Sequence, residues 1–195
     1  MSNEPLRLAV IISSVREGRM GPLLGAWFAA LAREREDFTV DLIDLADHEL
    51  PPAVAPHSPP PEAAEALAGI SPRLAGADAY VVVVPEYNRS YPAVLKLLID
   101  WHYTQWRAKP VGFVSYGGVS GGLRAVEHLR PVFAELHAVT VRDVVSFHTV
   151  WERFGEDGLP KDQQGPAGAA KVLLDQLAWW AAVLREGRAR TPYQV

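Results

Sequence analysis

An uninterrupted apolar run at residues 79–84 constrains the fold of this chain more than any other feature. It consists of Ala79, Tyr80 and four consecutive valines. A β-branched run of this kind is typical of a strand covered on both faces, as in the middle of a parallel sheet. A polar hexapeptide, residues 85–90, follows it, and Pro92 precedes a segment, 93–103, with the apolar spacing of a helix. The sequence therefore predicts a polar loop where a central strand ends and a helix begins.

Strands and helices alternate along the rest of the chain. Further strands are expected at 6–13, 38–44, 111–115 and 139–147, the last with an irregularity at Arg142 and Asp143. Helices are expected at 23–31, 62–68, 123–136 and 167–184, and Pro131 should kink or interrupt the third. This alternation predicts an α/β fold with a doubly wound, five-stranded parallel sheet in the order 2-1-3-4-5. We expect one domain over residues 1–195, with 185–195 as a flexible tail or an arm on a partner subunit.

The composition limits the classes of function. Of the 195 residues, 49% are hydrophobic and 22% are charged, as in an ordinary folded protein. The net charge of −4 argues against nucleic acid as a partner, because phosphate backbones are bound by basic surfaces. The lack of cysteine excludes disulfides and thiolate chemistry, and the six histidines show no metal-ligand spacing. No signal-peptide pattern or membrane-spanning apolar run is found, so we expect a cytoplasmic protein without a membrane partner.

The loop after the first strand is a candidate phosphate site. It contains Ser14, Arg16 and Arg19 and leads into a helix near Gly21. The first backbone N–H groups of a helix are unpaired and the helix dipole favours negative charge there. Ser14 could add a hydroxyl, and either arginine could add a charged fork for phosphate oxygens. The alternative is that both arginines are solvated surface charges.

Two further loops are expected at the same edge of the sheet. In residues 85–90, Tyr87 could pack against an aromatic ligand and the Asn88 amide could hydrogen-bond to its rim. Residues 117–122 contain four glycines, which let a backbone approach a flat ligand closely. In the order 2-1-3-4-5 the topological switch point, where the strand order reverses, lies between strands one and three. Folds with this order bind FMN at that point. An ordinary β–α turn and a flexible linker are the alternatives for the two loops.

Longer motifs extend these three loops. The pattern Pro-Glu-Tyr-Asn-x-Ser-x-Pro-x-x-Leu-Lys-x-x-Ile-Asp-Trp occupies residues 85–101. Ser-x-Arg-x-x-Arg occurs at residues 14–19, and Ser-x-Gly-Gly followed by Gly-Gly-Leu-Arg occurs at 115–124. Together, and over most of the chain, these motifs resemble the NADPH-dependent FMN reductases, whose relatives reduce azo dyes, quinones and chromate.

The resemblance implies a flavodoxin-like fold and assigns a role to each loop. The FMN phosphate would be held by Ser14, Arg16, Arg19 and the amides near Met20 and Gly21. The isoalloxazine would be lined by Pro85, Glu86, Tyr87 and Asn88, and bounded on its other side by Ser115, Tyr116, Gly117 and Gly118.

The same resemblance implies an FMN-dependent NAD(P)H oxidoreductase that passes hydride from NAD(P)H to flavin and electrons on to a flavin, quinone, azo compound or metal oxyanion. The cofactor carries this chemistry, so no catalytic acid, base or metal is assigned, and Glu86 is expected to cap the following backbone. NADPH is favoured by resemblance alone, and Arg89 occupies a variable position of the family motif. A flavodoxin-like electron carrier and a flavin-binding regulatory protein are the alternatives.

A homodimer or homotetramer is also expected. The helix at 93–103 carries apolar residues over a wide arc, and Trp101, Tyr103 and Trp106 add aromatic surface. A monomer would expose part of this surface, and the resembling family pairs subunits around this helix. The alternative is that the proline-rich loop at 46–61 folds over the helix and covers it.

Overall fold

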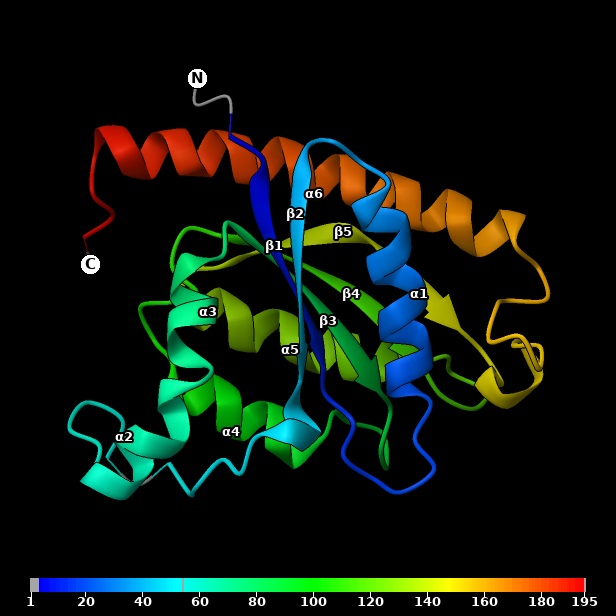
Figure 1. The fold of residues 1–195 in the computed structure, drawn as a ribbon, viewed down its shortest axis with the longest axis horizontal. Coiled ribbons are helices and arrows are strands. Elements are labelled where there is room, and N and C mark those ends of the chain that lie inside the picture. The colour runs from blue at the N-terminus through cyan, green and yellow to red at the C-terminus, as the bar shows by residue number, and fades with distance from the viewer. Residues whose placement is uncertain (1–3, 54, 195) are drawn as a thin grey trace.

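The computed structural model describes residues 4–53 and 55–194. Five strands form one parallel sheet in the order β2-β1-β3-β4-β5, which confirms the predicted fold class (Figure 1). The strands are β1 (Leu6–Ile12), β2 (Phe38–Asp44), β3 (Ala79–Pro85), β4 (Pro110–Tyr116) and β5 (Val139–Phe147). The α-helices are α1 (Gly21–Arg33), α2 (Pro61–Ala68), α3 (Ser71–Gly76), α4 (Ala93–Trp101), α5 (Leu123–Glu135) and α6 (Gln164–Arg190), and short 3-10 turns, η1 (Leu45–Asp47) and η2 (Val150–Glu152), follow β2 and β5.

Helices cover both faces of the sheet. α1 and α6 pack against one face, and α2, α3, α4 and α5 pack against the other, which gives a three-layer structure (Figure 1). β3 lies in the middle of the sheet between these two layers, and all seven of its residues are buried. The unbroken apolar run at 79–84 follows directly from this position, because neither face of the strand meets water.

β5 contains the irregularity expected near Arg142. Its pairing with β4 shifts between Val111, opposite Thr140, and Phe113, opposite Val144. Arg130 of α5 donates hydrogen bonds of 2.9 Å to the carbonyl oxygens of Val141 and Arg142. The bulge therefore does not leave these two carbonyls unpaired. α5 itself continues through Pro131 to Glu135 without a break.

The C-terminal helix is longer than the sequence pattern indicates. α6 begins at Gln164 and ends at Arg190, so residues 185–190 are helical and the expectation of a flexible tail there was wrong. That this segment lies on a partner subunit stays a prediction. Arg185 and Arg188 pair with Asp78 at 3.5 and 3.3 Å, which ties this end of the helix to the start of β3. Beyond residue 184 these ionic contacts, and not a periodic apolar face, hold α6 to the sheet, so the apolar spacing did not reveal this part of the helix. Among the described residues, no helix combines the length and the apolar character that a membrane span requires.

The tryptophans at the end of α4 and after it are buried within the chain. Trp106 is inaccessible to solvent, and its ring lies 4.6 Å from that of Tyr80 and 5.4 Å from that of Phe133. Trp101 is 5% exposed and its Nε1 donates to the carbonyl oxygen of Pro51 at 2.6 Å. The expectation that Trp106 adds exposed surface was wrong, because its ring is buried against Tyr80 and Phe133, whereas Tyr103 is 39% exposed as expected. Trp101 is covered in part by the proline-rich segment, at Pro51.

Candidate functional site

Three loops meet at the carboxyl edge of the sheet, as the topology predicts. They follow β1, β3 and β4, which are neighbours in the sheet. The Ser13 N–H and hydroxyl donate to the carbonyl of Val83 at 3.1 and 2.9 Å. The Glu86 N–H donates to the carbonyl of Tyr116 at 2.9 Å. Backbone contacts therefore hold the first loop against the end of β3, and the second against the end of β4.

A pair of buried hydroxyl groups marks the start of α1. Ser14 is fully buried and Tyr116 is 5% exposed, and neither side-chain oxygen has a hydrogen-bond partner among the described residues. Burial raises the pKa of the Tyr116 hydroxyl well above its ordinary value, with a smaller opposing effect from the neighbouring Ser14 hydroxyl. Unpartnered buried hydroxyls destabilise a fold, so such groups call for an explanation.

Gly21 leaves room for these hydroxyl groups. A Cβ atom on Gly21 would lie 2.1 Å from Ser14 Oγ and 3.1 Å from Tyr116 Oη. The first residue of α1 must therefore be glycine if both hydroxyls are to sit against the helix N-terminus. No side chain caps this N-terminus, at Met20. Two hydroxyl donors and the first turn of a helix thus converge on one point, which fits a phosphate oxygen.

Arg19 is held by the protein itself. Its guanidinium forms a two-bond pair with the Asp44 carboxylate at 2.7 and 2.8 Å and donates to the Ser14 carbonyl at 2.8 Å. The hydrogen bonds that Arg19 donates to Asp44 raise the pKa of Arg19, against a smaller effect of burial. Arg19 therefore fixes the loop to the end of β2. It does not present the free guanidinium for phosphate oxygens that the sequence offered as one possibility. Asp44 was missed in the sequence reading, although its place as the last residue of a strand next to β1 could have indicated it.

Arg16 remains available for a ligand. Its guanidinium carbon lies 3.6 Å from the centre of the Tyr87 ring, so it stacks on the second loop. Arg16 is exposed and pairs with no carboxylate among the described residues. Burial raises the pKa of Tyr87, and the nearby charges of Arg16 and then Arg19 oppose this shift. Arg16 was expected at the phosphate end of FMN and Tyr87 at its ring system. In this structure the two side chains are in direct contact.

The second loop is a tight turn with fixed geometry. Tyr87 and Ser90 exchange backbone hydrogen bonds of 2.8 and 3.0 Å, and Pro85 is buried at the end of β3. Asn88 and Arg89 between them have φ values of 49° and 72°. Positive φ at both central residues is the geometry of a type I′ turn, which asparagine tolerates well and arginine less so. The turn exposes both side chains and holds Tyr87 half-buried.

Glu86 is committed to structure, although in a different way from the one expected. Its carboxylate accepts from the Ser120 hydroxyl at 2.5 Å, the Arg124 guanidinium at 2.8 Å and the Arg124 N–H at 3.3 Å. Burial favours the neutral acid, but these hydrogen bonds outweigh it and lower the pKa of Glu86. Glu86 thus caps α5 across the glycine loop rather than its own following backbone, and it is not a proton donor at neutral pH.

The glycine loop is closely packed against its neighbours. Gly121 and Gly122 have φ values of 61° and 83°. A Cβ atom on Gly117 would lie 3.4 Å from Glu86 Cβ, and one on Gly118 would lie 3.6 Å from the Trp151 ring. Ser115 donates its hydroxyl to the Gly121 carbonyl at 2.8 Å, so this side chain shapes the loop from within. Tyr116 points to Ser14, at the expected phosphate end rather than beside the ring system.

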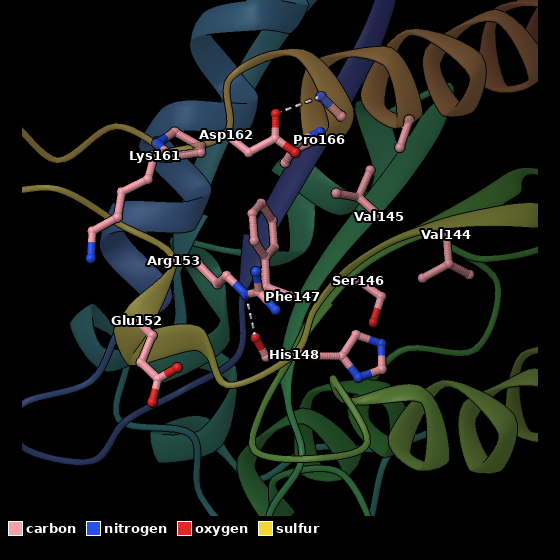
Figure 2. Close-up of a pocket in the computed structure, with 13 residues that line it drawn as sticks. Val144, Val145, Ser146, Phe147, His148, Glu152, Arg153, Lys161, Asp162 and Pro166 are labelled. Carbon is pink, nitrogen blue, oxygen red and sulfur yellow. Dashed lines mark hydrogen bonds between the residues drawn. The ribbon is translucent and has the colours of Figure 1, made fainter.

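The edge of the glycine loop also exposes apolar surface that the sequence reading missed. Val119 is 91% exposed and Trp151 is 63% exposed. Beside them, on the outer side of the edge strand β5, lies a cavity of about 620 Å³ that is lined by the end of β5, η2 and the start of α6 (Figure 2). His148 connects the two regions, because its Nδ1 lies 2.7 Å from the Val119 carbonyl oxygen. None of the residues predicted to bind the cofactor lines this cavity, so it is separate from the three-loop site.

Comparison with known proteins identifies the family. The model of the family described as NADPH-dependent FMN reductase matches residues 6–152. The chain belongs to this family. The assignment from the three motifs is thereby confirmed, and the family is one of oxidoreductases that use FMN with NAD(P)H.

Individual relatives agree with this assignment. An NAD(P)H-dependent FMN reductase of Schizosaccharomyces pombe is 35% identical over 120 residues, which are 60% of each chain, so the match spans about three fifths of that relative. A 2-hydroxy-1,4-benzoquinone reductase of a Burkholderia species is 35% identical over 141 residues, 69% of this chain and 73% of the relative. The solved structure of FerB, a flavoenzyme NAD(P)H:(acceptor) oxidoreductase of Paracoccus denitrificans, has a TM-score of 0.70 at 22% identity and covers 91% of this chain and 98% of its own. This last likeness concerns the fold.

Proposed function

We propose that this chain is an FMN-dependent NAD(P)H oxidoreductase that reduces a small electron acceptor. The observation that carries the proposal is the convergence of two buried, unpartnered hydroxyls, of Ser14 and Tyr116, on the first turn of α1 at Gly21. A phosphate oxygen at this point would accept from both hydroxyls and from the free N–H groups of the helix, including those near Met20. The loop that contains Ser14 also carries Arg16, whose charge is not paired with a carboxylate of the described residues.

The other predicted residues would position the rest of the cofactor. Arg19 and Asp44 hold the phosphate loop in place, and Arg16 supplies charge at its surface. The backbone of the turn after β3 would line the flavin ring, at Pro85, Glu86, Tyr87 and Asn88. The glycine loop would form the opposite boundary, with Gly117 and Gly118 giving close approach and Ser115 holding the loop's shape from inside.

The chemistry of the reaction would come from the cofactor. When bound, FMN would supply the transfer of a hydride from NAD(P)H and of electrons to a small acceptor. The protein would bind and orient FMN and would leave one face of its ring exposed. No side chain is assigned as acid or base, because the cofactor carries the chemistry. Glu86 is held ionised by Ser120 and Arg124 and is therefore not a proton donor. A relative that reduces a hydroxybenzoquinone supports a quinone among the acceptor classes, beside flavins, azo compounds and metal oxyanions.

A spectrum and a reduction assay test this function together. The purified protein should show flavin absorbance, and FMN should be released on denaturation. Anaerobic mixing with NADPH or NADH should bleach that absorbance, and a quinone should restore it over many turnovers. If dithionite alone bleaches the flavin, the protein is an electron carrier and the proposed activity is wrong.

The phosphate site makes a separate claim about affinity. FMN should bind at least about tenfold more tightly than riboflavin, because each charge-assisted hydrogen bond to phosphate contributes roughly 1.5–3 kcal/mol. Equal affinities for the two flavins would show that the phosphate site is misplaced. Preference for NADPH, a homodimer or homotetramer, and a cytoplasmic location stay predictions that accompany the proposal.

A further inference from the structure

A second cavity lies at the opposite end of the sheet from the three loops. It measures about 330 Å³ and lies between the segment before β4, the end of α3, the last turns of α6 and the residues after α6. In Figure 1 this is the end of the molecule where the red part of α6 ends and the chain turns away from the helix. Its polar lining consists of Thr104, Gln105, Arg107, Lys109, Arg188 and Tyr193.

The lining is strongly positive. It contains three cationic side chains, Arg107, Lys109 and Arg188, and no carboxylate. Asp78 pairs with Arg188 of the lining at 3.3 Å, and it is also engaged by Arg185 at 3.5 Å. Among the described residues, the positive charge at this cavity therefore exceeds the negative charge that could neutralise it.

Two of the three cations have a structural reason to be there. Arg188 donates to the Ala108 carbonyl and to Asp78, so it ties α6 to the sheet. Lys109 is 6% exposed, and its ammonium donates to the carbonyls of Leu74 and Ala75 and to the Tyr80 hydroxyl at 3.3, 2.9 and 3.1 Å. These partners are neutral, so the charge of Lys109 is hydrogen-bonded but not balanced.

Arg107 has no such reason. Its Nε is buried and has no acceptor among the described residues, and the guanidinium only stacks on the Tyr103 ring at 4.4 Å. An arginine is charged at any physiological pH, so a buried guanidinium N–H without an acceptor is costly. Arg107 is thus a half-buried arginine whose buried Nε–H is not paired by any of the described residues.

The backbone between Arg107 and Lys109 is also unusual. Ala108 has a φ of 50°, in the left-handed region that alanine rarely adopts. Its N–H donates to the His137 carbonyl at 2.8 Å, which holds this conformation. The result is that both neighbours of Ala108 line the same cavity. Backbone strain of this kind is often retained where it places functional side chains.

We propose that this cavity binds a small multivalent oxyanion of the phosphate class, with Arg107 as its principal ligand. The guanidinium fork of Arg107 matches the geometry of two phosphate oxygens, and the charges of Lys109 and Arg188 add attraction. Pro192 and the ring of Tyr193 add apolar surface to the lining, which suits the organic part of a phosphate ester. This site is distinct from the flavin phosphate site, which lies at the other edge of the sheet.

Calorimetric titration of the FMN-saturated protein tests the site, because FMN then occupies the other phosphate position. The probes are inorganic phosphate, pyrophosphate and ribose 5-phosphate, with sodium chloride at equal ionic strength as the reference. Saturable binding of at least one probe is expected, and the comparison of free phosphate with the ester identifies the source of the oxyanion. Heat that never saturates, or that chloride reproduces, would overturn the proposal.

Variants of Arg107 test its role. Arg107→Gln should weaken binding at least tenfold, and Arg107→Lys, which keeps the charge, should lose less. Arg190→Gln is the matched control. Arg190 is an exposed arginine near Arg188 at the C-terminal end of α6, but it does not line the cavity. Equal losses in Arg107→Gln and Arg190→Gln would show a general charge effect and would refute the site.

A measurement on the unaltered protein covers the case in which an Arg107 variant does not fold. Titration of pyrophosphate into ¹⁵N-labelled, FMN-saturated protein should shift the amide signals of Gln105, Arg107 and Tyr193. Signals of Ser14 and Gly21, at the flavin phosphate site, should stay in place. Shifts confined to those two residues would contradict the proposal.

Discussion

At the scale of single residues, the candidate site is identified by groups that the free protein leaves unsatisfied. The Ser14 hydroxyl is the clearest of these, because it is fully buried and has no partner among the described residues. A hydroxyl kept for structure would be hydrogen-bonded, as that of the adjacent Ser13 is to Val83. Stability and binding should therefore respond to Ser14 in opposite directions.

Ser14→Ala separates these two roles. The apoprotein should keep its stability or gain about 1 kcal/mol, because an unsatisfied buried polar group is removed. FMN affinity should fall about tenfold or more, whereas riboflavin affinity should change little. Denaturant unfolding of the apoprotein and fluorescence titration with both flavins give the two quantities. A loss of stability with unchanged FMN affinity would mean that Ser14 is a structural residue.

Gly21→Ala tests the space in front of this hydroxyl. The new methyl group would overlap Ser14 Oγ, so we expect weaker FMN binding and a loss of roughly 1–3 kcal/mol in the free energy of unfolding. Gly168→Ala is the control, because a Cβ atom on that helical glycine of α6 meets no atom within 4 Å. The control should be stabilised by roughly 0.5–1 kcal/mol and should bind FMN normally. FMN titration and denaturant unfolding of both variants give the two quantities. Equal FMN affinities and equal stabilities of the two variants would contradict the close approach of Gly21 to the Ser14 hydroxyl.

At the scale of elements, Lys109, the residue before β4, is a buried cation that links the start of β4 to α3 and β3. Burial and, to a smaller extent, the Arg188 charge lower the pKa of Lys109 to about 8, and the Asp78 charge opposes both. The folded state therefore releases a proton as the pH rises through about 8, whereas an unfolded lysine keeps its proton to about 10.5. Because the unfolded state then binds more protons, this residue should make the protein more stable as the pH rises.

Lys109→Met isolates this effect. Between about pH 8 and pH 10, the stability of the wild type relative to the variant should rise by about 2 kcal/mol. Above this range the buried Tyr80 and Tyr116, whose pKa values burial raises, contribute with the opposite sign. Urea unfolding at several pH values, in buffers free of phosphate, gives the comparison. A difference that stays constant with pH would show that Lys109 has an ordinary pKa in the folded protein.

The same scale shows what the sequence could predict. Apolar periodicity located all five strands, because burial on two faces leaves a direct pattern in β1, β3 and β4. Their order followed from the alternation of strands and helices, which is typical of doubly wound folds. It did not find residues 185–190 of α6, where contacts of Arg185 and Arg188 with Asp78 replace apolar packing. The motifs located the three loops, but not the partners inside them. The pairing of Arg19 with Asp44 and of Glu86 with Arg124 depends on distances between loops that no local pattern contains.

At the scale of the whole molecule, the structure changes the argument for a dimer. Trp101 and Trp106 are buried in the single chain and offer no interface. What remains on this side is a groove between α4 and α5, lined by Ile99, Pro131, Val132 and Leu136 with charged residues around it. Leu97, one turn before Trp101, is half-buried on the same helix. An apolar groove with a charged rim resembles the centre and edge of an interface between subunits.

We therefore expect a dimer that pairs through α4 and α5. Light scattering at micromolar concentration should give at least twice the 21.4 kDa of one chain. Val132→Glu should reduce this mass to that of the monomer, because Val132 lines the groove and a carboxylate there would be buried in the interface without a partner. Val172→Glu is the control, since Val172 is 46% exposed on α6, which covers the other face of the sheet. A wild-type mass of one chain would exclude the dimer, and dissociation by Val172→Glu alone would place the interface on α6.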